Sequence, residues 1–136
     1  MLPVGPGQPR GGGTMSGATG VRILVAEDDP IVRKLCVTLL RGAGYDVAAV
    51  ANGKEALTLL GDETFALIVS DATMPELDGV ELVAEVRRRG DTIPILLMSG
   101  YSDGRVEANA PGATAHLAKP FTGSALVSAV ENALAR

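Results

Sequence analysis

The chain has 136 residues, of which 46% are hydrophobic and 21% are charged, and this composition predicts one globular domain. Its net charge of −4 is the wrong sign for a domain that binds nucleic acid or an anionic membrane by its own surface. No apolar run approaches the roughly 20 residues of a membrane span, and the start of the chain lacks a secretion-signal pattern. The single cysteine, Cys36, excludes an internal disulfide and is expected to be a buried small hydrophobe. We therefore expect a cytoplasmic protein.

The first twenty residues differ in composition from the rest. They contain seven Gly and three Pro with almost no large apolar side chain, so they cannot bury enough surface to offset the entropy of ordering. We interpret residues 1–20 as a flexible interdomain linker or a remnant of cloning, and residues 21–136 as the folded domain.

From residue 21 onward, short apolar runs alternate with longer stretches of helical period, which predicts five βα units and a parallel sheet. The expected strands are residues 23–26, 47–50, 66–69, 95–98 and 115–118. Most of these strands are continuously apolar, as in a sheet that helices cover on both faces.

Capping residues mark the expected helices. Asp29 precedes Pro30, and one face of the following helix carries Ile31, Leu35, Thr38 and Leu39 until the glycines at 42 and 44. Further helices are expected after Gly79 and after Thr122. The segment 103–111 is short and contains Pro111, so we expect a frayed helix or only a turn or two there.

Polar residues follow four of the five predicted strands. The residues in question are Glu27, Asp28 and Asp29 after the first, Asp71 after the third, Ser99 after the fourth and Lys119 after the fifth. Because the carboxyl ends of parallel strands share one edge, where open α/β sheets bind ligands, these groups are expected to meet in one site.

The charges of this site suggest its ligands. Glu27, Asp28 and Asp71 place three negative charges together, which either raises a pKa or recruits a cation. Hard oxygen ligands with few protein donors suit Mg²⁺. With Mg²⁺ and Lys119 the formal charges cancel, so the site can admit a further anion such as a phosphoryl group. Asp71 is then the candidate nucleophile.

Four segments together resemble the signature segments of the response-regulator receiver domain of two-component signalling. They are residues 23–30, 70–79, 98–101 and 119–121. The resemblance runs from about Val21 to Arg136, and it is specific because all four segments occur in order with βαβ spacing. It implies a flavodoxin-like, doubly wound (βα)5 fold whose five-stranded parallel sheet has the order 2-1-3-4-5.

The resemblance also implies a role for each acidic residue. Asp71 would be the phosphoacceptor. Asp28 would bind Mg²⁺ directly, Glu27 directly or through water, and the backbone carbonyl of Thr73 would add another metal ligand. Asp29 is expected to cap a helix instead of binding metal.

Further residues are implied around the phosphoryl group. Ser99 would donate a hydrogen bond to one phosphoryl oxygen, and Lys119 would pair with another, with a cis peptide bond between Lys119 and Pro120. Side chains at Thr73 and Tyr101 would tune the lifetime of the phosphorylated form.

Two positions depart from the family pattern. The family often has Thr where this chain has Ser99. It usually has a switching Tyr or Phe at the position of His116, so this imidazole either replaces the ring as a partner contact or still moves between two positions with Ser99.

The implied function is to take a phosphoryl group from the phosphohistidine of a kinase or phosphotransfer protein onto Asp71. The domain would assist its own phosphorylation and dephosphorylation without being an enzyme in the usual sense. The resulting conformational change would control a downstream protein at the face of the fourth helix, fifth strand and fifth helix. We expect a monomer or weak dimer.

Two other functions are weighed against this one. A Mg²⁺-dependent phosphatase with an aspartyl nucleophile commonly needs a second acid where this chain has Thr73. A receiver-like binding module that is not phosphorylated would have lost Asp71 or Lys119, and neither is lost. The sequence leaves open whether the domain is free-standing or part of a hybrid histidine kinase.

Overall fold

The computed structural model describes residues 20–100 and 110–135. The elements are β1 Arg22–Ala26, α1 Pro30–Gly42, β2 Asp46–Val50, α2 Gly53–Asp62, β3 Leu67–Asp71, α3 Gly79–Arg88, β4 Ile95–Gly100, β5 Ala115–Lys119 and α5 Gly123–Leu134. All five predicted strands are confirmed. Tyr101, residues 1–19 of the predicted linker and most of the short helix expected in 103–111 lie outside the described residues.

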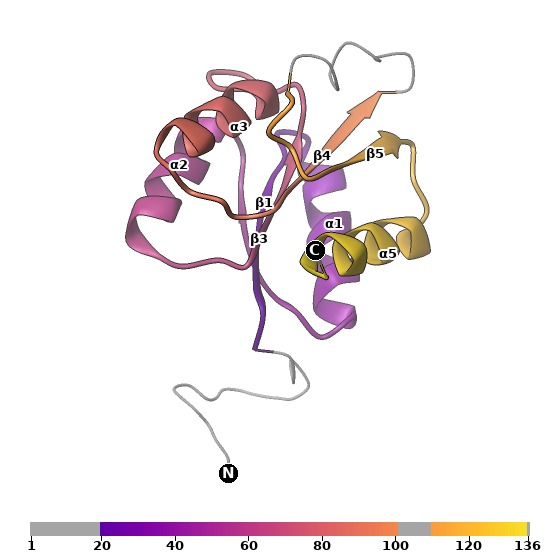
Figure 1. Ribbon diagram of the computed structural model, residues 1–136. Coiled ribbons are helices and arrows are strands. Elements are labelled where there is room, and N and C mark those ends of the chain that lie inside the picture. The colour runs from indigo at the N-terminus through magenta and orange to yellow at the C-terminus, as the bar shows by residue number, and fades with distance from the viewer. Residues whose placement is uncertain (1–19, 101–109, 136) are drawn as a thin grey trace.

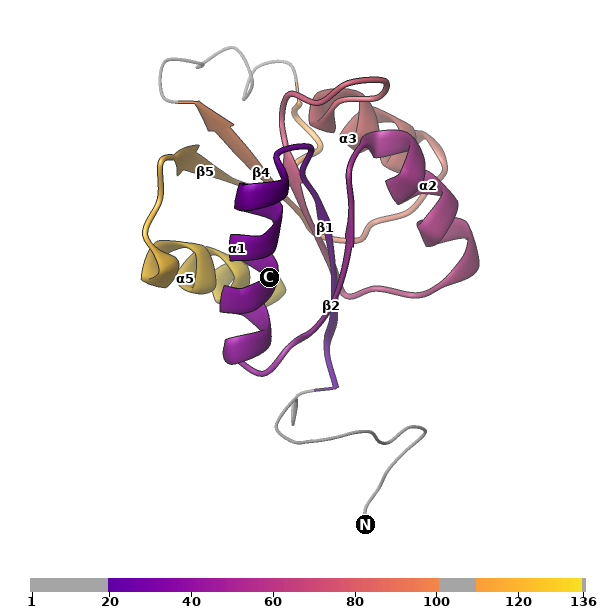
Figure 2. The same cartoon turned by 180° about the vertical axis from the view of Figure 1, so that it is seen from behind.

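The five strands form one parallel sheet in the order β2-β1-β3-β4-β5, which confirms the predicted fold. The chain moves from β1 outward to β2 and then returns past β1 to β3. The order therefore reverses between β1 and β3, and ligands of open α/β sheets bind beside the carboxyl ends of such strands. Figures 1 and 2 show the sheet edge-on from opposite sides.

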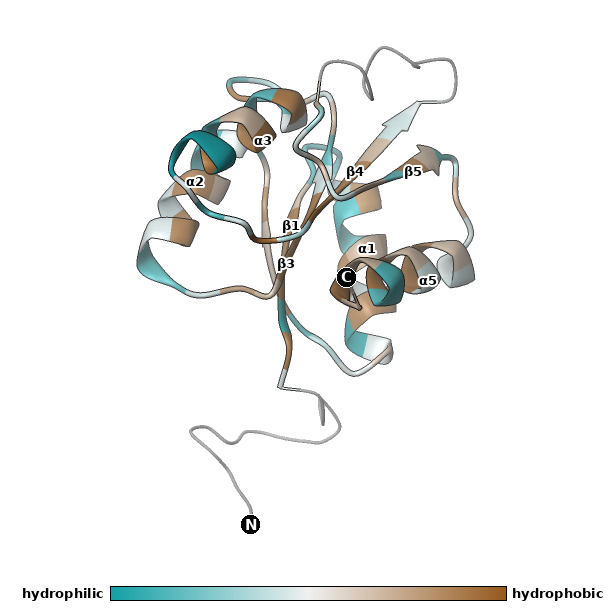
Figure 3. Cartoon of the chain, viewed as in Figure 1, coloured by the Kyte–Doolittle hydropathy of each residue, from teal (hydrophilic) through white to brown (hydrophobic). Residues whose placement is uncertain are grey.

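Each face of the sheet is covered by a helical layer (Figure 1). Alternate strand residues point to opposite faces, so Leu24 and Ile68 pack with α2 and α3. Ile23 and Val69 pack instead with α1 and α5. Apolar residues accordingly pack on both sides of the central strands, much of whose length has hydrophobic colours in Figure 3. No helix among the described residues has both the length and the apolar character that a bilayer crossing requires.

Helix α1 begins as predicted, because the Asp29 side chain accepts hydrogen bonds from the first N–H groups and Pro30 is the first helical residue. The face assigned from the sequence differs from the buried one. Ile31 is 79% exposed and Leu35 is 46% exposed, whereas Cys36 and Leu40 are buried. The helix has apolar residues on more than one side, so its periodicity alone does not identify the packed face.

Cys36 is buried, as predicted. Burial raises the pKa of its thiol to about 11, so the thiol stays protonated at neutral pH.

The loop from β3 to α3 passes close beneath the end of β3. The Gly79 N–H donates to the Ala72 carbonyl at 3.0 Å, and a Cβ at Gly79 would collide with the carbonyl oxygen of Asp71. Asp78 caps α3 in a capping box with Glu81. These contacts fix the chain immediately after Asp71.

Candidate functional site

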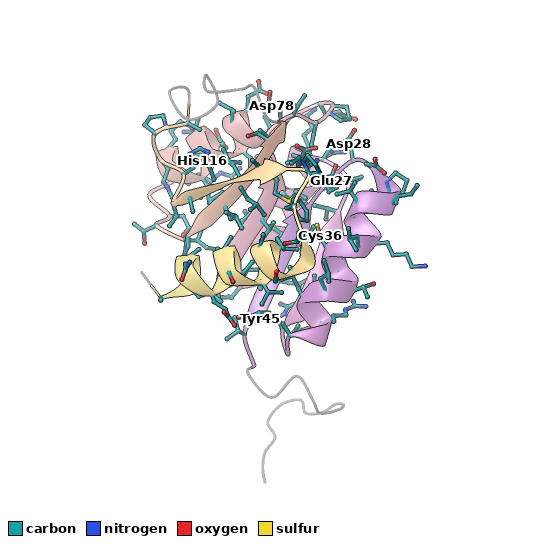
Figure 4. The ribbon with its side chains drawn as sticks, turned by 90° about the vertical axis from the view of Figure 1, so that its right-hand side faces the viewer. Glu27, Asp28, Cys36, Tyr45, Asp78 and His116 are labelled. Atoms are coloured by element: carbon teal, nitrogen blue, oxygen red, sulfur yellow. The ribbon has the colours of Figure 1, made fainter. Side chains whose placement is uncertain are left out.

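The polar residues predicted from the strand ends lie at one edge of the sheet. Glu27 follows β1, and Asp71 and Lys119 are the last residues of β3 and β5. Ser99 is the next-to-last residue of β4. In Figure 4, Glu27 and Asp28 lie at the upper end of the sheet, beside the start of α1. The strands β3, β4 and β5 extend farther than predicted, so their polar residues belong to the sheet itself.

Three carboxylates form the centre of this site. One oxygen each from Glu27, Asp28 and Asp71 lies within 4.8 Å of the others. Glu27 is fully buried and Asp71 is 9% exposed, whereas Asp28 is exposed. The cluster therefore reaches solvent on the Asp28 side.

Lys119 joins two of these carboxylates. Its Nζ donates to Glu27 Oε1 at 2.9 Å and to Asp71 Oδ2 at 3.1 Å. Burial acts to lower the pKa of Lys119, but the hydrogen bonds and negative charges of both partners outweigh it and raise that pKa. The ammonium therefore remains charged and compensates part of the negative charge of the cluster.

The pKa of the Glu27 carboxyl is raised. Burial, reinforced by the charge of Asp71, raises the pKa of Glu27 to about 7, although hydrogen bonds from Lys119 and from the Asp29 N–H oppose this shift. A cation bound here would therefore compete with a proton for this carboxylate near neutral pH.

The donor set fits a hard divalent cation. Carboxylate oxygens are the ligands that Mg²⁺ prefers, and the exposed Asp28 leaves access for metal-bound waters. Lys119 offsets only one of the three charges when Glu27 is ionised, so electrostatics also favours a cation. Thr73 lies beside the cluster, where its N–H donates to Asp71 Oδ1 at 3.5 Å.

The two predicted switch residues lie on the last two strands. Ser99 pairs in register with Ala118, and His116 pairs with Leu97. Leu117 packs with the α1 and α5 layer, so strand alternation places His116 on the opposite face, as predicted. Among the described residues, His116 Nδ1 is a buried polar atom without a hydrogen-bond partner.

Sequence reasoning missed Arg33. Its guanidinium donates to the backbone carbonyls of Glu27 and Asp28, at 2.9 and 3.5 Å. The one available signal for this contact was that Arg33 follows Asp28 by five residues. At this separation a long side chain on α1 can reach back over the helix start.

Residues 23–131 match the response regulator receiver domain family. The chain belongs to this family. A receiver domain is a regulatory domain, and the resemblance stated from the sequence is confirmed.

Two curated relatives are long response regulators. The receiver domain is 41% identical over 112 residues to the response regulator protein FleR of Pseudomonas aeruginosa, which covers 80% of this chain and 24% of FleR. It is 37% identical over 117 residues to the transcriptional regulatory protein ZraR of Escherichia coli K12, which covers 85% of this chain and 26% of ZraR. The chain thus spans about a quarter of each relative.

Solved structures show the same receiver fold. The response regulator TrrA of Thermotoga maritima, in complex with Mg²⁺ and BeF, is 30% identical with a TM-score of 0.77, covering 83% of this chain and 98% of TrrA. The signal receiver domain of a histidine kinase from Syntrophus aciditrophicus is 33% identical with a TM-score of 0.79, covering 85% and 91% of the two chains.

Proposed function

We propose that this receiver domain accepts a phosphoryl group on the Asp71 carboxylate from a phosphohistidine. The observation that carries the proposal is the convergence of Asp71, Glu27, Asp28 and Lys119 at the carboxyl edge of the sheet. An Asp71 oxygen attacks phosphorus while the phosphorus–nitrogen bond of the donor breaks. The electron pair returns to the imidazole nitrogen, and an acyl phosphate forms on Asp71.

The residues around Asp71 orient it for this transfer. Lys119 holds Oδ2, and the Thr73 N–H lies 3.5 Å from Oδ1, so both oxygens are held in position. Lys119 also supplies a fixed positive charge where the phosphoryl oxygens gather negative charge. Ser99, next to the end of β4, donates a hydrogen bond to another of these oxygens.

Glu27, Asp28, Asp71 and the backbone carbonyl of Thr73 would hold Mg²⁺ in this site. When bound, the ion neutralises charge on the transferring phosphoryl oxygens. TrrA is in complex with Mg²⁺ and BeF, which supports a Mg²⁺ ion at this site.

The remaining roles follow the family pattern. Phosphorylation draws Ser99 toward Asp71, and Thr73 and Tyr101 set the lifetime of the acyl phosphate. His116 departs from this pattern, and on β5 it either moves with Ser99 or serves as a partner contact without switching. We assign residues 21–136 to the receiver domain and residues 1–20 to a linker or a remnant of cloning. We place the protein in the cytoplasm, where kinase-derived phosphoryl groups are available.

We assign the phosphodonor, a histidine kinase or phosphotransfer protein, to the surface of α1. This helix begins directly after Asp28 and Asp29 and exposes Ile31 and Leu35 one turn apart. These are exposed large hydrophobic residues beside the acidic cluster, as a docking surface requires. Binding there brings the donor histidine to Asp71. A downstream protein would bind the face that includes β5 and α5.

Labelling with a small phosphodonor tests the assignment. Acetyl phosphate with Mg²⁺ should phosphorylate the chain, and Asp71→Asn or EDTA should abolish labelling. Asp62→Asn removes an exposed carboxylate at the end of α2 and should leave labelling unchanged. Labelling that persists in Asp71→Asn contradicts the assigned phosphoacceptor, and continuous hydrolytic turnover without a labelled chain favours a phosphatase.

A further inference from the structure

Besides Lys119, a second cationic side chain reaches the acidic site. Arg33 lies in α1, and its Nη1 nitrogen donates to the carbonyl oxygens of both Glu27 and Asp28. The first of these bonds is partly buried, at 2.9 Å, and the second is 3.5 Å long. One guanidinium nitrogen therefore bonds to two successive peptide groups.

These two peptide groups lie on either side of the Asp28 α-carbon. The Glu27 carbonyl belongs to the peptide that precedes it, and the Asp28 carbonyl to the peptide that follows. The orientations of the two planes set φ and ψ at Asp28, and these angles set the direction of its side chain. Arg33 thus acts on the Asp28 carboxylate through the backbone.

The other two carboxylates are held differently. Glu27 and Asp71 each accept a hydrogen bond from Lys119, and the Glu27 N–H also donates to Val50 O at 3.0 Å. Asp28 is exposed, and within residues 20–100 and 110–135 nothing hydrogen-bonds its carboxylate directly. The direction of the Asp28 side chain therefore depends mainly on the backbone of Asp28, whereas hydrogen bonds to the carboxylates also hold Glu27 and Asp71.

We propose that Arg33 is a positioning residue for the metal site, which orients Asp28 as a ligand before the ion binds. The proposal rests on the Mg²⁺ site of the proposed function. Groups that orient metal ligands without touching the metal typically contribute 10-fold to 100-fold to metal affinity. Arg33 stabilises the ligand geometry in this way, although its side chain carries the same sign of charge as the ion.

The positive charge of Arg33 allows the sign of the change in Mg²⁺ affinity to distinguish two roles for this residue. A nearby positive charge repels Mg²⁺, so a purely electrostatic role predicts that removal of Arg33 tightens binding. A positioning role predicts the opposite, because the released loop must be ordered when the ion binds. The sign of the change separates the two roles.

Mg²⁺ titrations by calorimetry, with the metal alone and no phosphodonor, provide the measurement. Arg33→Met keeps much of the side-chain length but removes the donors, and we expect the affinity to fall by about tenfold. Lys34→Met removes the same charge from the exposed neighbouring position and should change the affinity less than about twofold. Arg33→Lys, which retains the charge and one donor group, should recover part of the loss.

Backbone amide spectra of each variant in EDTA give a second readout. The Asp28 and Asp29 amides should shift in Arg33→Met while those of the strands stay in place, and thermal unfolding should confirm that each variant is folded. If Arg33→Met binds Mg²⁺ as tightly as the wild type, or more tightly, the positioning role is overturned. If Arg33→Met does not fold, the same result with Arg33→Lys overturns it. Wild-type protein that fails to bind Mg²⁺ instead overturns the proposed function.

Discussion

Lys119 and Glu27 are 92 residues apart in the sequence, and Lys119 Nζ donates a 2.9 Å hydrogen bond to Glu27 Oε1. The same ammonium also contacts Asp71, so one cation serves a buried carboxylate and the proposed phosphoacceptor at once. In the proposed function, phosphorylation of Asp71 would place phosphoryl oxygens in reach of this ammonium. Glu27 would then share Lys119 with a more highly charged group, and bound Mg²⁺ would neutralise part of the Glu27 charge.

Replacement of Lys119 tests this shared arrangement. Lys119→Met leaves Glu27 buried without its cation, and because Lys119 is only 24% exposed we expect the free energy of unfolding in EDTA to fall by about 1–3 kcal/mol at pH 8. The loss should be smaller at pH 6, where Glu27 is protonated. Phosphorylation by acetyl phosphate should slow, while Mg²⁺ still binds.

Chemical denaturation at the two pH values checks the prediction. Lys54→Met is the matched control. Lys54 Nζ lies 3.8 Å from Glu76 Oε1 at an exposed position, so this variant should have an unchanged free energy of unfolding. An equal loss at pH 6 and pH 8 would contradict the role of Glu27 protonation.

The pH dependence of Mg²⁺ binding follows from Glu27. Its pKa is raised from 4.5 to about 7 in the metal-free fold, so the folded state binds an extra proton between these values. The contribution of this carboxyl to the free energy of unfolding of the metal-free protein therefore falls as the pH rises from about 4.5 to 7. Mg²⁺ must displace the same proton, and its affinity should fall about tenfold between pH 8 and pH 6.

Calorimetry in buffers of different ionisation enthalpy measures the proton released when Mg²⁺ binds. Glu27→Gln should bind Mg²⁺ more weakly but with a flatter dependence on pH over this range. A wild-type affinity that does not change between pH 6 and pH 8 would show that Glu27 is ionised before the metal binds.

The close approach of α3 to β3 predicts a steric effect at Gly79. Gly79→Ala would place a methyl group against the Asp71 carbonyl, which must move to make room. We expect the free energy of unfolding to fall by about 2 kcal/mol or more, together with a loss of phosphorylation, since the displaced residue is the proposed phosphoacceptor.

Gly61→Ala provides the control for this substitution. Gly61 lies in α2, and an added Cβ there would meet no atom within 4 Å. Since Ala has a higher helix propensity than Gly, this variant should be at least as stable as the wild type. Denaturant unfolding and acetyl phosphate labelling of both variants test the comparison.

The parts of the molecule that follow from local pattern could be predicted from the sequence. Apolar strand runs gave the sheet, and the polar residues at their ends gave the members of the site. The Asp29 cap and the start of the last helix after Thr122 are also confirmed. Such features depend on short segments or on the shared edge of a parallel sheet. The cis Lys119–Pro120 bond, which the family resemblance implied, is confirmed as well.

Tertiary contacts required the structure. The packed side of α1 depends on how the helix lies on β1 and α5, so the pattern at Ile31 and Leu35 did not identify it. The bridge from Lys119 to Glu27 joins opposite ends of the chain, and Arg33 bonds to carbonyl groups that every residue possesses. Residue spacing gives no sign of the first contact, and for the second it gives only the five-residue separation between Arg33 and Asp28.

The exposed side of α1 provides the last prediction. If Ile31 and Leu35 contact the phosphodonor protein, Ile31→Lys and Leu35→Lys should slow phosphotransfer at least tenfold, because buried apolar contacts near an interface centre dominate binding energy. Acetyl phosphate needs no docking surface, so labelling by this small donor should be unchanged. The difference between the two donors separates loss of docking from damage to the Asp71 site.

The measurement is transfer of a radiolabelled phosphoryl group from a histidine kinase. The kinase is chosen from a panel as the one that labels the wild-type chain fastest. Thr58→Lys adds the same charge at an exposed position of α2, on the opposite face of the sheet, and should transfer normally. Unfolding curves should be similar for all three variants, since the substituted side chains are exposed. If Ile31→Lys and Leu35→Lys accept phosphate from the kinase as fast as Thr58→Lys, the donor binds elsewhere on the domain.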